Sequence, residues 1–153
     1  MSAHRVTVSW MLAVEGAEFL KRRYSRVHRL VFEGGAEVKG TPATSVVPAP
    51  WSAADGVDPE GAFTGALSAC HMLWFLDHAA RAGFVVASYV DEAEGTLGRL
   101  GPGKMAMTRV VLRPKVSFAG DPPSPAQIDA FHEAAHRDCF IANSVTTEVV
   151  VES

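Results

Sequence analysis

Residues 57–83 of the chain, VDPEGAFTGALSACHMLWFLDHAARAG, decide its fold. Asp58 is a good helix cap, Pro59 suits the first helical position, and Glu60 places negative charge where the helix dipole favours it. Gly83 is the residue type that most readily adopts the backbone conformation found just after a helix. The stretch therefore predicts one long helix, which begins at Pro59 and ends two residues before Gly83.

The middle of this predicted helix is apolar around most of its circumference. Residues 62–76, AFTGALSACHMLWFL, offer few polar positions on any face. A helix that lies on a protein surface has a polar side, so this one is expected to be surrounded by protein. Cys70 lies in the middle of this segment.

Alternating polar and apolar residues predict strands on the N-terminal side of the helix. Residues 4–10 place Val6 and Val8 on one face, as in a half-buried strand. Residues 29–33 and 36–39 flank two glycines and predict a second pair of strands joined by a turn.

The segments between these elements are expected to be loops. Residues 11–25 break the alternating pattern, and residues 41–53 contain three prolines. Nothing before the second segment is long enough to fold alone, so it is expected to be an ordered loop and not a linker between domains.

More strands and a second helix follow. Residues 84–94 and 105–118 predict a strand pair whose second member is long enough to bend, and residues 144–151 predict a last strand. Between them, Ser124 and Pro125 repeat the cap-and-proline signal and open a helix with a single apolar face, formed by Ile128, Phe131 and Ala135. The order of elements predicts an α+β fold.

Composition limits the classes of protein that the chain can belong to. With 153 residues, 48% of them hydrophobic and 20% charged, residues 1–153 are expected to form a single domain with a real core. A net charge of -3 gives no electrostatic reason to bind nucleic acid or anionic lipid. No apolar stretch approaches roughly 18 residues and no secretory signal opens the chain, so a cytoplasmic protein that does not bind membranes is expected.

The two cysteines are candidates for chemistry, although an inert buried role is also open to each. Cys70 and Cys139 are 69 residues apart, and this spacing alone does not pair them. A cysteine nucleophile must be a thiolate, yet a free thiol with a pKa near 8.5 is only about 3% ionised at pH 7. A nearby arginine would supply the missing stabilisation, and Glu60, nearly three helical turns before Cys70, is a candidate to hold one.

These residues resemble a known family. Asp58-Pro59-Glu60 followed by Ser68-Ala69-Cys70, with Cys139 after the second helix, is similar to the helix and cysteine pair of the OsmC/Ohr proteins, which reduce organic hydroperoxides. The resemblance implies an OsmC-like fold, in which antiparallel sheets wrap around long central helices and two chains intertwine as a homodimer.

The resemblance also implies a mechanism. Cys70 would attack the peroxide, Arg26 would stabilise the thiolate, Glu60 would orient Arg26, and Cys139 would close a disulfide that an external dithiol reduces. The position of the arginine leaves Arg29 open as an alternative to Arg26. No metal, flavin or nucleotide cofactor is implied.

Two other functions are open. The better-known family members have proline after the second cysteine, whereas Phe140 follows here, which leaves open a binding or stress protein of the same fold with silent thiols. His132, Glu133 and His136 match the HExxH pattern of zinc hydrolases. That pattern lacks an evident third ligand, and the two histidines are expected to face solvent. His71 and His78 are expected to pack or to form hydrogen bonds.

Overall fold

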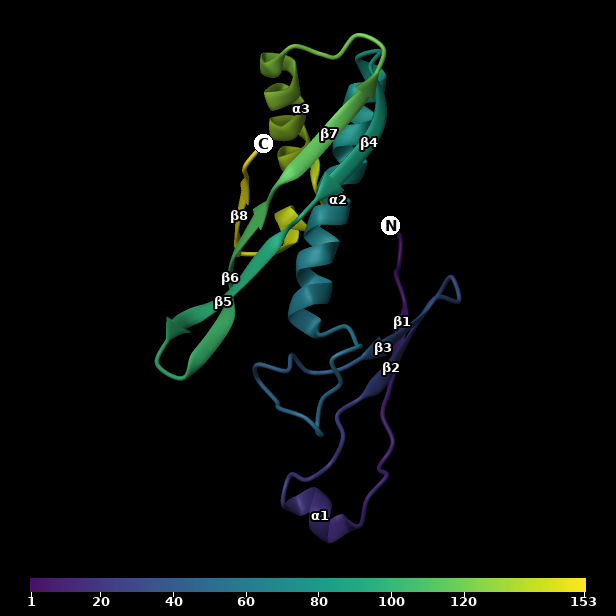
Figure 1. Cartoon of the computed structure of the whole chain (residues 1–153), viewed down its shortest axis with the longest axis vertical. Helices are drawn as coiled ribbons and strands as arrows, with labels where there is room; N and C mark the ends of the chain where they lie inside the picture. Colours follow the sequence, from purple (N-terminus) through teal and green to yellow (C-terminus); the bar gives the residue numbers. More distant parts are fainter. The chain divides into compact units, whose positions relative to one another are not determined.

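The computed structural model describes residues 1–153, which divide into two compact units, Met1–Ala62 and Phe63–Ser153 (Figure 1). Both units are described separately below. Helices and strands occur together throughout, so the predicted α+β class is confirmed. None of the helices is both long and apolar enough to cross a membrane.

The first unit contains a small antiparallel sheet. Its strands are β1 (Val6–Ser9), β2 (His28–Phe32) and β3 (Glu37–Gly40), in the order β1-β2-β3. The three strands were predicted, and Gly35, with φ of +84°, makes the turn between β2 and β3. A short helix, α1 (Gly16–Leu20), lies in the segment that was expected to be only a loop.

The burial predicted for the first strand is wrong. All four residues of β1 are exposed, and Val6 and Val8 keep 48% and 61% of their surface open to solvent. The alternation correctly predicted a strand, but within the first unit its apolar face stays open to solvent.

The proline-containing segment after β3 is an ordered loop, as predicted. Thr41 is 2% exposed, and its hydroxyl accepts a hydrogen bond of 2.9 Å from the backbone N–H of Ala53. The backbone N–H of Thr41 in turn donates to the carbonyl of Val57 at 3.1 Å. These bonds attach both ends of the loop to the end of β3.

Helix α2 (Pro59–Arg81) has the predicted bounds. Asp58 caps it by accepting a hydrogen bond of 2.8 Å from the backbone N–H of Gly61. At the other end, Gly83 adopts φ of +85°, and the N–H of Phe84 donates back to the carbonyl of Ala79 at 3.0 Å. The helix therefore begins and ends for the reasons that its sequence indicates.

The strands of the second unit form a long bent ladder. They are β4 (Val85–Asp91), β5 (Glu94–Gly101), β6 (Lys104–Leu112), β7 (Pro114–Ala119) and β8 (Glu148–Val151). Strand β4 pairs with β7, β5 pairs with β6, and β8 lies parallel to β6 (Figure 1). The predicted bend is the break between β6 and β7. The predicted last strand is shorter than expected: β8 begins at Glu148, after the 3₁₀ helix η1 (Ala142–Ser144) and three residues that belong to no strand.

Strand β5 was not predicted from the sequence, because its glycines resemble those of a loop. In the structure these glycines leave room for neighbouring side chains. A Cβ atom on Gly98 would lie 2.6 Å from the hydroxyl of Thr108, and one on Gly95 would lie 2.5 Å from the Met107 methyl group. These contacts make glycine the suitable residue in a true strand.

Two clusters form the core of the second unit, and α2 contributes to both. Leu67 packs with Val110 and Leu112 of β6, while Phe75 packs with Ala135 of α3 (Pro125–Asp138). The buried residues of α2 lie on one face: Thr64, Leu67, His71, Phe75 and Ala79. On the other side Leu73 is 62% exposed. The expectation that protein surrounds this helix is therefore not met within a single chain.

Candidate active site at Cys70 and Cys139

The two cysteines meet in the second unit. Cys70 is half-buried in the middle of α2, and Cys139, 1% exposed, is the first residue after α3; both are free thiols. Burial raises the pKa of the Cys139 thiol to about 11, and so does the hydrogen bond that this thiol makes with Cys70. The structure thus brings together two predicted site residues that the sequence could not pair by spacing.

Helix packing explains this contact. Ser124 and Gln127 form a capping box that starts α3, and the helix ends at Asp138, so that Cys139 caps its C-terminus. Ala135, one turn before Cys139, packs against Phe75 of α2. The end of α3 is therefore held beside the middle of α2, where Cys70 lies.

A surface groove opens beside Cys70. It has a volume of about 370 Å³ and is lined by Cys70, Leu73, Trp74, Asp77, Arg81 and Phe140. Phe140 is 69% exposed, and Trp74 lies against it with ring centroids 5.4 Å apart. Phe75, by contrast, is fully buried in the core. The groove gives Cys70 an apolar surface that an organic molecule can contact.

Arg26 belongs to the first unit and precedes β2. Its guanidinium lies 4.2 Å from the centre of the Tyr24 ring and donates to the backbone carbonyls of Tyr24 and Arg22 at 3.1 and 3.4 Å. It lines a mostly aromatic pocket of about 400 Å³, together with Val8, Trp10, Phe19, Tyr24 and His28. Arg26 is thus partly buried and held at one edge of an apolar pocket.

Arg29 has a different environment. It lies on β2, is exposed, and binds both carboxylate oxygens of Glu37 on β3. An exposed arginine that is already paired in this way serves mainly to join two strands. Glu60 is half-buried in the first turn of α2, as its position in the sequence predicted.

The expectation that both histidines of the HExxH pattern face solvent is wrong for one of them. His136 is exposed as predicted, but His132 is only 4% exposed, and its Nδ1 lies 3.0 Å from Nε2 of His71. Burial lowers the pKa of both His71 and His132. His71 and His78 form hydrogen bonds, as expected. The structure contains no group of three His, Cys, Asp or Glu side chains arranged to hold a metal ion.

Reasoning from the sequence missed the contacts on either side of Cys139. Asp138 accepts a hydrogen bond from His78 of α2, and Phe140 packs on Trp74. The sequence signal for these contacts is the four-residue spacing of Cys70, Trp74 and His78, which places the three residues on one face of α2.

Comparisons with known proteins identify the family. A family model described as OsmC-like protein matches residues 52–153. An OsmC-like protein of unknown function from Vibrio cholerae is 46% identical, with 99% of each chain covered and a TM-score of 0.94. A comparison with curated protein sequences found no match.

Two more distant structures share the fold. An organic hydroperoxide resistance protein from Elizabethkingia anophelis is 16% identical, with a TM-score of 0.70 over 99% of this chain and 93% of the other. The organic hydroperoxide resistance protein OhrB of Bacillus subtilis is 14% identical, with a TM-score of 0.65 over 99% and 97%. Together with the family match over residues 52–153, these findings confirm the predicted resemblance: the chain belongs to the OsmC-like protein family.

Proposed function

We propose that the protein is a thiol-dependent peroxidase that reduces organic hydroperoxides to alcohols. The observation that carries this proposal is the contact between Cys70, which opens onto an apolar groove, and the buried Cys139. A nucleophilic thiol needs access to its substrate, and a thiol that resolves the product needs to be close to the nucleophile. This pair of cysteines meets both requirements.

The proposed reaction has two steps in the protein. The Cys70 thiolate attacks one peroxide oxygen, the O–O bond breaks, and the alkoxide leaves and takes a proton to give the alcohol, while Cys70 becomes a sulfenic acid. Cys139 then attacks the sulfenic sulfur, and the disulfide forms with loss of one water. An external dithiol, oxidised in exchange, returns both cysteines to thiols.

Arg26 and Glu60 complete the proposed site. Arg26 stabilises the thiolate and the negative charge that develops on the leaving oxygen, and Glu60 orients the guanidinium. We favour Arg26 over Arg29 because Arg26 lines an apolar pocket, whereas the guanidinium of Arg29 is already bound to the carboxylate of Glu37. No cofactor takes part in this scheme.

We also propose that the protein works as a homodimer in the cytoplasm. Exposed apolar residues such as Val8 on β1 and Leu73 on α2 are the kind of surface that a second copy would cover. A reducing compartment suits a disulfide that forms only during turnover. Light scattering of the purified protein measures the mass directly, and a monomer at micromolar concentration would contradict the dimer.

Consumption of peroxide tests the proposed function. The purified protein is mixed with dithiothreitol as the dithiol and with either cumene hydroperoxide or hydrogen peroxide. We expect faster consumption of the organic peroxide, because an apolar groove binds its organic group. If Cys70 reacts with both peroxides no faster than a free thiol, the peroxidase proposal fails and a binding protein of the same fold remains.

A further inference from the structure

One face of α2 carries three residues at intervals of four. Cys70, Trp74 and His78 follow one another along the helix and therefore lie in a row. Trp74 and His78 stack with ring centroids 6.0 Å apart, which makes this part of the row a continuous surface.

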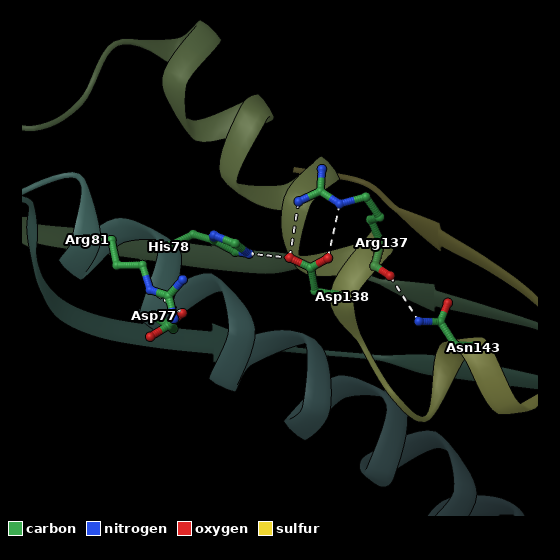
Figure 2. Close-up of polar contacts among 6 residues, drawn as sticks. All are labelled: Asp77, His78, Arg81, Arg137, Asp138 and Asn143. Atoms are coloured by element: carbon green, nitrogen blue, oxygen red, sulfur yellow. Dashed lines mark hydrogen bonds and ion pairs between the residues drawn. The ribbon is translucent and has the colours of Figure 1, made fainter.

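The chain that leaves α3 lies along this row. Asp138, Cys139 and Phe140 are consecutive, and each contacts one member of the row on α2. The Asp138 carboxylate accepts a hydrogen bond of 3.0 Å from His78 Nε2 (Figure 2). Cys139 contacts Cys70, and the Phe140 ring meets Trp74 at an interplanar angle of 88°.

Local hydrogen bonds shape the segment around Cys139. The side chain of Asn143 donates to the carbonyl of Arg137 at 3.0 Å (Figure 2). Its backbone N–H donates to the carbonyl of Cys139, also at 3.0 Å. The Arg137 guanidinium donates to both oxygens of Asp138 and fixes the plane of the carboxylate. All these bonds lie within the α3 end and its turn, so they do not connect Cys139 to α2.

Besides the packing of Ala135 against Phe75, the neighbours of Cys139 on both sides connect it to α2. His78 and Asp138 have side chains that are 17% and 29% exposed, so water competes only in part for their hydrogen bond. The bond does not need a charged His78, because a neutral imidazole with its proton on Nε2 also donates.

We propose that the contact between His78 and Asp138 positions Cys139 over Cys70, with the packing of Phe140 on Trp74 as a second anchor. His78 and Asp138 are positioning residues: they set how often the two sulfurs are within bonding distance. The effect of these two residues on peroxide turnover rests on the proposed function, because disulfide closure is the second step of the proposed reaction.

Equilibration with glutathione tests the positioning without any peroxide. One glutathione disulfide oxidises the two protein thiols and releases two glutathione molecules, so the ratio of disulfide to dithiol protein reports the effective concentration of one cysteine at the other. Mass spectrometry after acid quenching counts both forms. His78→Ala and Asp138→Ala should each lower the equilibrium constant roughly tenfold, as expected for loss of a hydrogen bond to a charged group.

Two further variants separate positioning from general stability. The amide of His78→Gln donates to Asp138 as the imidazole does, and this variant should restore most of the loss. Ser124→Ala removes the cap at the opposite end of α3 and destabilises the same helix, but it should leave the constant within about twofold of the wild-type value.

The outcomes are distinct. Equal constants for wild type, His78→Ala and Asp138→Ala would overturn the proposal, as would an equal loss in Ser124→Ala. If Asp138→Ala does not fold, the comparison of His78→Ala with His78→Gln gives the same answer from the α2 side. A protein that consumes no peroxide but shows the predicted glutathione constants refutes the proposed function and leaves the positioning role intact.

Discussion

The Cys139 thiol contacts Cys70, although 69 positions of sequence separate the two residues. The contact joins the middle of α2 to the end of α3, where the chain turns into η1. Within this pair the two cysteines differ: Cys70 opens onto a groove, and Cys139 is buried. This difference predicts different consequences when either is replaced.

Replacement of each cysteine by serine should separate the two steps. Cys70→Ser removes the proposed nucleophile and should abolish peroxide consumption. Cys139→Ser should still react once and should then accumulate a sulfenic acid at Cys70, because the thiol that condenses with it is missing. A dimedone adduct detected by mass spectrometry measures this species. If Cys139→Ser turns over at the wild-type rate, Cys139 is not the resolving residue.

Closure of the disulfide should accelerate with pH. Burial is the main reason that the pKa of Cys139 is raised to about 11, and the interaction with Cys70 is the second reason. At neutral pH only a small fraction of Cys139 is therefore in the thiolate form that attacks. Below this pKa the thiolate fraction rises about tenfold per pH unit, and the closure rate should rise with it. Rapid-quench sampling between pH 7 and pH 9 after one equivalent of peroxide would measure this rate. A rate independent of pH would contradict a buried thiol as the attacking group.

Arginine variants test which cation assists Cys70. Arg26→Ala should slow the first oxidation of Cys70 by roughly tenfold or more, because the cation that we propose to stabilise the developing charge is lost. Arg29→Ala should have little effect on this rate, since its guanidinium is exposed and bound to Glu37. Stopped-flow fluorescence after addition of organic hydroperoxide measures the step. The reverse result would assign the role to Arg29.

The buried histidine pair should make stability depend on pH. Burial lowers the pKa of His71 from 6.5 to about 4, with smaller contributions from His132 and His136. The unfolded chain therefore binds a proton between these values that the folded chain excludes. The free energy of unfolding should fall as pH drops from 6.5 toward 4, by up to about 1.4 kcal/mol per pH unit.

Urea unfolding at a series of pH values measures this dependence. His71→Gln cannot titrate in this range but still offers a hydrogen-bonding amide to His132, so its stability should vary less steeply with pH. His4→Gln is a suitable control, because His4 is exposed and does not contribute to the lowered pKa of His71. An unchanged slope in His71→Gln would show that other groups cause the dependence.

Local signals in the sequence predicted most of the secondary structure. Asp58, Pro59 and Gly83 define the ends of α2, and the capping box at Ser124 starts α3, because capping depends on residues within one helical turn. The one strand that the prediction missed is β5. Its glycines are explained by the side chains of Thr108 and Met107, which are close only in the folded sheet.

By itself, the sequence determined the long helices α2 and α3, most strands, and Cys70 and Cys139 as the residues able to carry thiol chemistry. Only the tertiary structure decided that the two cysteines meet, that His132 is buried, and that Asp138 binds His78. The physical reason is the distance along the chain over which each interaction acts. Capping and periodicity act between residues a few positions apart, whereas these contacts depend on how α3 packs against α2, which the whole core of the second unit determines.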